Sequence, residues 1–181
     1  MRKWGIISWF FLVGNYCVAQ LCTPTIAGFP YNEDFETSDG NWVAGGVASD
    51  WTWGSPSKTL ITGAGTGNRC WITGGLSTAT YNTNQKSWLM SPCFNLTALR
   101  YPELRFQLFW DTQQFFDGGS IEYSTDGGNT WKILGDINSE VYCKGTNWFN
   151  TNSVFSQNLH GWTGNVKATV SGCLGGFGSG K

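Results

Sequence analysis

The side chains that could catalyse a reaction are few in this chain, and their spacing fits no common catalytic arrangement. His160 is the single histidine, and a Ser-His-Asp triad built on it would lack the Gly-x-Ser-x-Gly nucleophile elbow. A retaining glycosidase needs two carboxyl groups about 5 Å apart, which jelly-roll glucanases carry on one strand as Glu-x-Asp-x-x-Glu. The sequence contains no such run. We therefore predict that this domain is not an enzyme.

Nucleotide and zinc sites are not expected either. The segment 175–181 reads GGFGSGK and fits Gly-x-x-x-x-Gly-Lys, but a P-loop also needs a buried parallel strand before it and a helix after it. Its glycine-rich surroundings predict neither element, so we interpret the match as chance. No two cysteines form a Cys-x-x-Cys pair, and one histidine adds little, so zinc is not predicted.

One pair of carboxylates has a spacing that suits a cation. Asp34 and Glu36 lie two residues apart in the segment Pro30–Glu36, which we expect to be a first strand or a sheet edge, so both side chains would share a face. They would either hold a calcium ion or face water. On an exposed edge, solvent is the commoner environment.

Aromatic side chains are the candidates for ligand binding. Trp51 and Trp53 flank Thr52 in a strand-like segment and would point the same way, either into the core or as a flat platform for sugar rings. Phe115 and Phe116 fall between two predicted strands, where exposed aromatics offer contact area at low entropy cost. The tentative ligand-binding residues, all in or beside predicted loops, are Trp51, Trp53, Phe115, Phe116, Trp148 and Phe149.

The elements that would position these residues are strands. From Glu103 to Asp111, apolar residues alternate with mainly polar ones, and this period of two indicates a half-buried strand with Leu104, Phe106, Leu108 and Trp110 facing inward. A hairpin is predicted to follow, in which the inward residues are Ile121, Tyr123, Trp131 and Ile133. Shorter strands are expected at 70–73, at 87–94 with an end at Pro92, and at 166–170.

The turn of that hairpin has a recognisable sequence. Residues 124–131 read STDGGNTW and fit the Asp-box pattern Ser-x-Asp-x-Gly-x-Thr-Trp. The Asp126 carboxylate can accept hydrogen bonds from turn amides, Gly128 can adopt a positive φ, and Trp131 can anchor the returning strand. Asp boxes recur in sialidase propellers away from the reacting atoms, and a single copy without blade repeats predicts a structural turn here.

The first residues predict export. A basic start, an apolar run from Trp4 to Val13 and small residues before Gln20 form a signal peptide over residues 1–19, which is too short to span a membrane. We divide the remainder into a linker at 20–28, one domain at 29–170 and a glycine-rich tail at 171–181. About 160 residues are enough for a single domain with its own core.

Charge and cysteine content restrict the partners and the compartment. The chain has 11 Lys and Arg against 12 Asp and Glu with no basic cluster, so neither nucleic acid nor an anionic membrane is an expected partner. Five cysteines follow the signal peptide, and some should pair in an oxidising compartment: Cys22, Cys70, Cys93, Cys143 and Cys173. Because five is odd, either one thiol is free or its partner lies beyond Lys181.

The order of these motifs resembles one known family. Asp34-Phe35-Glu36, Trp51-Thr52-Trp53-Gly54, the segment 87–94 (SWLMSPCF), Leu104–Trp110, Asp117-Gly118-Gly119 and the Asp-box hairpin follow one another as in a MAM-like jelly-roll module. The resemblance covers about Phe29 to Trp162. Such modules occur in large secreted and surface proteins of gliding bacteria that use type IX secretion, and as accessory parts of secreted metallopeptidases.

The resemblance implies an all-β fold, namely a two-sheet antiparallel β-sandwich of jelly-roll, concanavalin-like type, which is usually non-catalytic. It also implies a structural cation, Ca²⁺, near the first strand, with Asp34, Glu36 and Asp117 as the positions that would bind it. Here the chain departs from the family, because 171–181 lacks the alternating run that closes the sandwich and its further acidic ligands. We therefore expect a jelly roll that is incomplete at its C-terminal end, with an unpaired strand edge.

Two functions follow as expectations. In the first, the chain is a secreted, non-catalytic binding or adhesion module that recognises a glycan or a protein at the cell surface. In the second, it is an accessory domain of a larger secreted hydrolase such as a metallopeptidase. Both place further domains in the parent protein.

Overall fold

The described part of the chain is built from strands. The computed structural model describes residues 24–77, 80–139, 145–154, 158–174 and 177, so the predicted signal peptide lies outside it. Every element named in these ranges is a strand, and they contain no helix long and apolar enough to cross a membrane. The predicted all-β class is confirmed.

Twelve strands are named in the described residues, and most are short. Their bounds are β1 Thr25–Ile26, β2 Val43–Val47, β3 Thr52–Gly54, β4 Cys70–Ile72, β5 Lys86–Met90, β6 Cys93–Phe94, β7 Glu103–Asp111, β8 Glu122–Tyr123, β9 Lys132–Ile133, β10 Thr151–Val154, β11 Leu159–Gly161 and β12 Asn165–Cys173. They pair two by two, antiparallel except for β1 with β6. This pairing is compatible with the predicted β-sandwich, while its jelly-roll connection stays a prediction.

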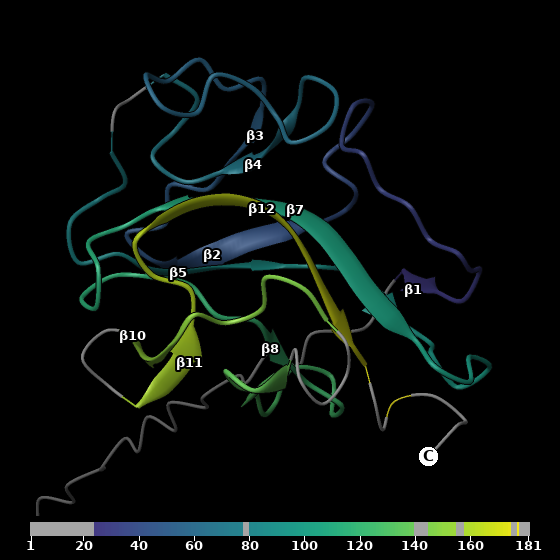
Figure 1. Cartoon of the computed structure of the whole chain (residues 1–181). Coiled ribbons are helices and arrows are strands. Elements are labelled where there is room, and N and C mark those ends of the chain that lie inside the picture. The colour runs from purple at the N-terminus through teal and green to yellow at the C-terminus, as the bar shows by residue number, and fades with distance from the viewer. Residues whose placement is uncertain (1–23, 78–79, 140–144, 155–157, 175–176, 178–181) are drawn as a thin grey trace, which may run out of the picture.

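The longest ladder joins β7 to β12, which lie side by side through the middle of the molecule (Figure 1). The register runs without a break from Asn165 opposite Asp111 to Cys173 opposite Glu103. Along β7 the side chains alternate as predicted: Glu103, Arg105 and Gln107 are exposed while Leu104 and Phe106 are half-buried. The pattern works because successive side chains of a strand point to opposite faces.

The core is an aromatic cluster that β7 and β12 share with more distant segments. Trp162 is at its centre, with ring centroids at 4.8 Å from Phe149, 5.8 Å from Trp148, 6.0 Å from Trp110 and 6.1 Å from Phe106. Most of these pairs are edge-to-face, an arrangement that stabilises by about 0.5–1.5 kcal/mol per pair beyond the burial of area. The Trp162 indole N–H donates to the carbonyls of Asn147 and Trp148 at 3.0 and 2.9 Å, so its polar atom is satisfied.

β12 extends beyond the predicted end of the domain. We expected the strand to stop at Val170, but it continues through Ser171 and Gly172 to Cys173. Glycine is required at position 172, because a Cβ there would lie 2.4 Å from the Trp148 ring. The start of the glycine-rich stretch is therefore a strand against which the core tryptophan packs, and the strand ends at Cys173 instead of the expected Val170.

The predicted first strand is also corrected. Pro30–Glu36 contains no strand, and the first strand within the described residues is β1 at Thr25–Ile26. Local hydrogen bonds explain the difference, because the amide of Phe35 donates to the Glu33 carboxylate at 2.8 Å and that of Glu36 to Asp34 at 3.0 Å. Such side-chain acceptors compete with a strand ladder for the backbone donors. Phe35, with φ of 60°, completes a turn.

The Asp-box hairpin forms as predicted, except for one residue. Asp126 accepts hydrogen bonds from the backbone and hydroxyl of Thr130 at 2.9 and 2.6 Å, and Gly128 has a φ of 90°. Ile121, Tyr123 and Ile133 pack against the core as predicted. Our inward assignment of Trp131 was wrong, because this side chain is exposed and its indole N–H donates to the carbonyl of Gly128 in the turn at 3.1 Å.

Cysteine pairing is partly determined. Cys93 is disulfide-bonded, while Cys70 is a half-buried free thiol. Cys22 and Cys143 lie outside the described residues, so the complete pairing stays a prediction.

Candidate binding surface

The loop between β7 and β8 presents two adjacent aromatic rings to solvent. Phe115 and Phe116 are 56% and 58% exposed, as the sequence analysis expected for this pair. The loop is nevertheless well ordered by its own backbone, because the amides of Phe116 and Asp117 both donate to the carbonyl of Gln113, at 3.1 and 2.9 Å. The rings are therefore held outward by a hydrogen-bonded turn.

A buried hydroxyl fixes this turn from below. The Thr163 hydroxyl accepts a hydrogen bond from the Phe115 amide at 2.8 Å and donates to the Asp117 carbonyl at 2.8 Å. Thr163 is 4% exposed, so water cannot replace either bond. Its own amide and carbonyl are bonded to Asn150 and to the Trp110 indole, both at 3.0 Å, which ties the loop to the core.

Phe115 has a backbone conformation that its side chain disfavours. Its φ is 69°, in the left-handed region that residues other than glycine, asparagine and aspartate rarely adopt. This conformation costs about 1–2 kcal/mol for a residue with a Cβ. Strained residues of this kind cluster at binding and catalytic sites, and the strain here turns a large apolar ring toward solvent.

Tyr81 supports the same loop from another segment. Its hydroxyl donates to the Asp117 carboxylate at 2.7 Å. Burial and the neighbouring carboxylate raise the pKa of Tyr81 to about 12, because both disfavour the phenolate. Asp117, an expected cation ligand, therefore acts in this structure as a hydrogen-bond acceptor that holds Tyr81 against the loop.

Trp51 and Trp53 do not form an open platform. Both are half-buried, and the Trp53 indole N–H donates to the carbonyl of Phe35 at 2.8 Å. The Arg69 guanidinium lies over the Trp53 ring at 4.9 Å from its centroid, so one face of that ring is already occupied. Of the two interpretations of this tryptophan pair, packing agrees better with the structure.

Trp148 and Phe149 are core residues. They are 4% and 5% exposed and belong to the aromatic cluster around Trp162. We expected them beside an exposed loop, and this placement is wrong, because Gly172 of β12 leaves the space into which Trp148 packs. Neither ring can contact a ligand at the surface.

The acidic segment at 33–36 organises its own backbone. Glu36 accepts hydrogen bonds from the amides of Asn68 and Arg69, both at 2.7 Å. These two bonds lower the pKa of Glu36, because they stabilise the carboxylate form. Within the described ranges no group of three or more His, Cys, Asp or Glu side chains is placed to hold a metal ion. The proposed calcium site at Asp34, Glu36 and Asp117 is therefore not brought together.

His160 has a structural contact. Its Nδ1 accepts a hydrogen bond from the amide of Ile137 at 3.3 Å. In this role the imidazole is an acceptor for a loop amide.

Two residues that matter to the loop were missed in the sequence. Thr163 and Tyr81 are 48 and 36 residues away from the groups they bond in the Phe115–Asp117 segment. Neither has a local pattern that points to this loop.

Comparisons with known proteins give one partial match. No family model matches the chain, and no solved structure matches it. Bacillopeptidase F of Bacillus subtilis (strain 168) is 29% identical over 111 residues, which is 61% of this chain and 8% of that protein. The chain thus spans less than a tenth of the relative's length, and the similarity concerns a small segment of a much larger polypeptide.

Proposed function

We propose that the chain is a non-catalytic binding domain that accompanies a larger extracellular hydrolase of the peptidase class. The partial similarity to Bacillopeptidase F supports this, since 61% of the chain aligns with only 8% of a protein whose name marks it as a peptidase. Export rests on the predicted signal peptide, and the MAM-like jelly-roll assignment belongs to the same proposal. The chemistry of hydrolysis would lie elsewhere in the parent protein.

The observation that carries the binding role is the aromatic loop, defined by residues 112–119. It combines two rings that are more than half exposed with a strained φ of 69° at the first of them. In contrast, Trp110, Trp148, Phe149 and Trp162 are buried in the core, where they stabilise the fold. Exposed, preorganised aromatics instead supply contact area with little entropy lost on binding.

Phenylalanine favours a protein target over a sugar. A sugar site combines a stacking ring with polar groups that bond the hydroxyls, whereas adjacent phenylalanines offer only apolar area. The Asp117 carboxylate beside them is already bonded to Tyr81. The expected ligand is therefore an apolar segment of an unfolded or extended protein, which is also what a peptidase acts on.

A retention assay tests the proposal. We expect the chain to be retained on beads carrying heat-denatured casein and to pass over chitin and cellulose. Replacing both rings, Phe115→Ala with Phe116→Ala, should reduce retention at least tenfold, and Phe116→Ala alone should show part of the loss. Tyr101→Ala is the matched control, because Tyr101 is 76% exposed in a different loop.

Three outcomes would contradict the proposal. Equal retention of the double variant would show that the aromatic loop does not bind. Absence of retention on every support would remove the binding role. Retention on a polysaccharide that disappears in the double variant would replace the protein target with a glycan.

A further inference from the structure

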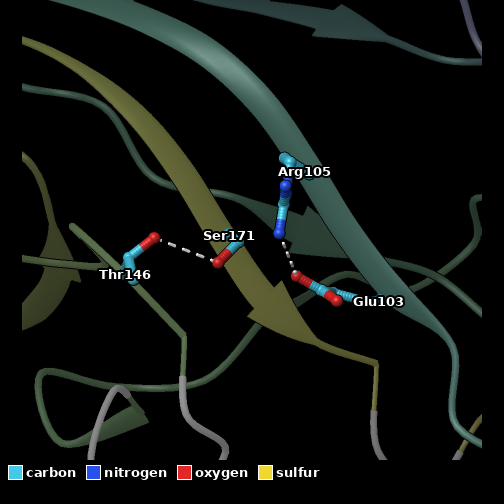
Figure 2. Close-up of polar contacts among 4 residues, drawn as sticks. All are labelled: Glu103, Arg105, Thr146 and Ser171. Carbon is cyan, nitrogen blue, oxygen red and sulfur yellow. Dashed lines mark hydrogen bonds and ion pairs between the residues drawn. The ribbon is translucent and has the colours of Figure 1, made fainter.

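The hydrogen-bonding direction of each residue in β7 follows from one contact on β12. The amide and carbonyl of Ser171 bond to Thr146, at 3.1 Å in each direction, and Figure 2 shows Thr146 on the side of β12 away from β7. Ser171 therefore directs its backbone groups away from β7. In an antiparallel pair, opposite residues either both bond across the ladder or both point outward. Arg105, which lies opposite Ser171, thus also points outward.

The same parity applies along the strand. Arg105, Gln107, Phe109 and Asp111 direct their amides and carbonyls to the edge of β7 that lies away from β12. In the described ranges β7 pairs with β12 alone, and no backbone hydrogen bond reaches these outward groups from another described segment. The loop that contains Gly65 comes close to Gln107. It approaches the side chain of Gln107, because a Cβ added at Gly65 would meet side-chain atoms of that residue. Among the residues that the structure describes, nothing therefore pairs with the outer edge of β7.

The opposite edge of the ladder is partly closed. Besides the Thr146 bridge to Ser171, the side-chain amide of Asn147 donates to the carbonyl of Thr169 at 2.9 Å. Figure 2 shows β12 along one side of β7. An open edge is a template for another strand, and proteins usually cover it or guard it with charge.

The charges on β7 complement those of a second copy. Antiparallel pairing of two β7 edges around Leu108 places Gln107 opposite the partner's Phe109 and Arg105 opposite the partner's Asp111. By symmetry the Arg–Asp pair occurs twice. Shifting the register to put Gln107 opposite the partner's Gln107 would instead place Glu103 opposite the partner's Asp111, which repels. Of these two registers, the charges therefore favour the one centred on Leu108.

Arg105 is available for this role. Its guanidinium lies 3.5 Å from the carboxylate of Glu103 (Figure 2), and both side chains are more than half exposed. An ion pair this exposed contributes little. We propose that two copies of the chain associate through their β7 edges, as an antiparallel, two-fold symmetric strand pair in which Arg105 faces the partner's Asp111. Each pair of outward residues adds two backbone hydrogen bonds.

Charge reversal in sedimentation velocity tests the dimer. We expect the chain to sediment as a species of twice its 19.9 kDa mass at about 100 μM and as a monomer at about 1 μM. Asp111→Arg should shift the midpoint to at least tenfold higher concentration, because two arginines then face each other. Arg105→Asp should do the same. The double variant Arg105→Asp with Asp111→Arg should restore the dimer, and Lys132→Asp on the distant β9 should leave it unchanged.

Hydrogen exchange distinguishes this edge from other interfaces. The amides of Arg105, Gln107 and Phe109 should exchange at least tenfold more slowly at high protein concentration, while those of Phe106 and Leu108 are protected at every concentration. A monomer throughout, single reversals without effect, failure of the double variant to recover, or an unchanged exchange pattern would each overturn the proposal. Because Arg105 and Asp111 are exposed, a folding defect does not account for a reversal that the double variant repairs.

Discussion

The hydroxyl of Thr163 offers the sharpest test of how the aromatic loop is held. Thr163→Val keeps the size of the side chain and removes the oxygen. That oxygen accepts from the Phe115 amide and donates to the Asp117 carbonyl, both at 2.8 Å, and the side chain is almost fully buried. The variant therefore leaves one donor and one acceptor without a partner.

The magnitude follows from those two groups. Each buried polar group left unsatisfied costs about 1–3 kcal/mol, so the free energy of unfolding should fall by about 2–6 kcal/mol. With a urea dependence of about 2 kcal/mol per molar, the unfolding midpoint should drop by about 1–3 M. Thr163→Ser is the matched control. It keeps the hydroxyl and loses one buried methyl, so its loss should be about 1 kcal/mol.

Equilibrium urea unfolding followed by tryptophan fluorescence measures both variants, because Trp110 bonds directly to the Thr163 carbonyl at 3.0 Å. Retention on denatured casein should weaken in Thr163→Val, since Phe115 loses the bond that fixes its backbone. If Thr163→Val is as stable as wild type, or no less stable than Thr163→Ser, the loop does not depend on this hydroxyl and the reasoning is refuted.

Three further predictions concern other parts of the fold. The hydrogen bonds to the Asp126 carboxylate hold its pKa below the usual range. The stabilising effect of this carboxylate is therefore present above about pH 4 and is lost as the pH falls. Asp126→Asn should flatten the decline of the urea midpoint between about pH 5 and pH 2. Tyr81 should titrate near pH 12 in ultraviolet absorbance, and its stabilising effect should disappear as the pH rises above about 10. Tyr81→Phe should show neither this titration nor this loss of stability. Gly118→Ala should lose about 3 kcal/mol of stability, because its Cβ would lie 2.2 Å from the Trp162 carbonyl oxygen, while Gly119→Ala, with nothing within 4 Å, should change stability by about 0.5 kcal/mol or less.

The features that the sequence predicted correctly depend on neighbouring residues. β7 was expected over Glu103–Asp111 and has those bounds, because alternation of apolar and polar residues requires only the local pleat. The Asp-box turn formed for a similar reason, since Ser124, Asp126 and Thr130 bond one another within seven residues. The break at Pro92 between β5 and β6 likewise follows from one residue that cannot donate to a ladder.

The incorrect predictions concern residues whose environment is set by distant parts of the chain. Trp148 and Phe149 stand between polar neighbours and suggest a loop locally, yet Gly172 on β12 provides the space that buries them. Trp131 was assigned inward from a hairpin whose register the sequence does not determine. For the aromatic loop, exposure was predicted, but its two anchoring residues come from segments tens of positions away.

The position of Thr163 explains how a strained loop can persist on this fold. Trp162 is the centre of the aromatic core, and the next residue bonds the loop, so the rigidity of the core passes to the loop through a single peptide unit. The strain at Phe115 costs about 1–2 kcal/mol, which is offset by the two Thr163 bonds and by the amides of Phe116 and Asp117 bonded to Gln113. Because these bonds hold the backbone of Phe115 in place, both rings of the loop stay at the surface, where the ligand of our proposal would contact them.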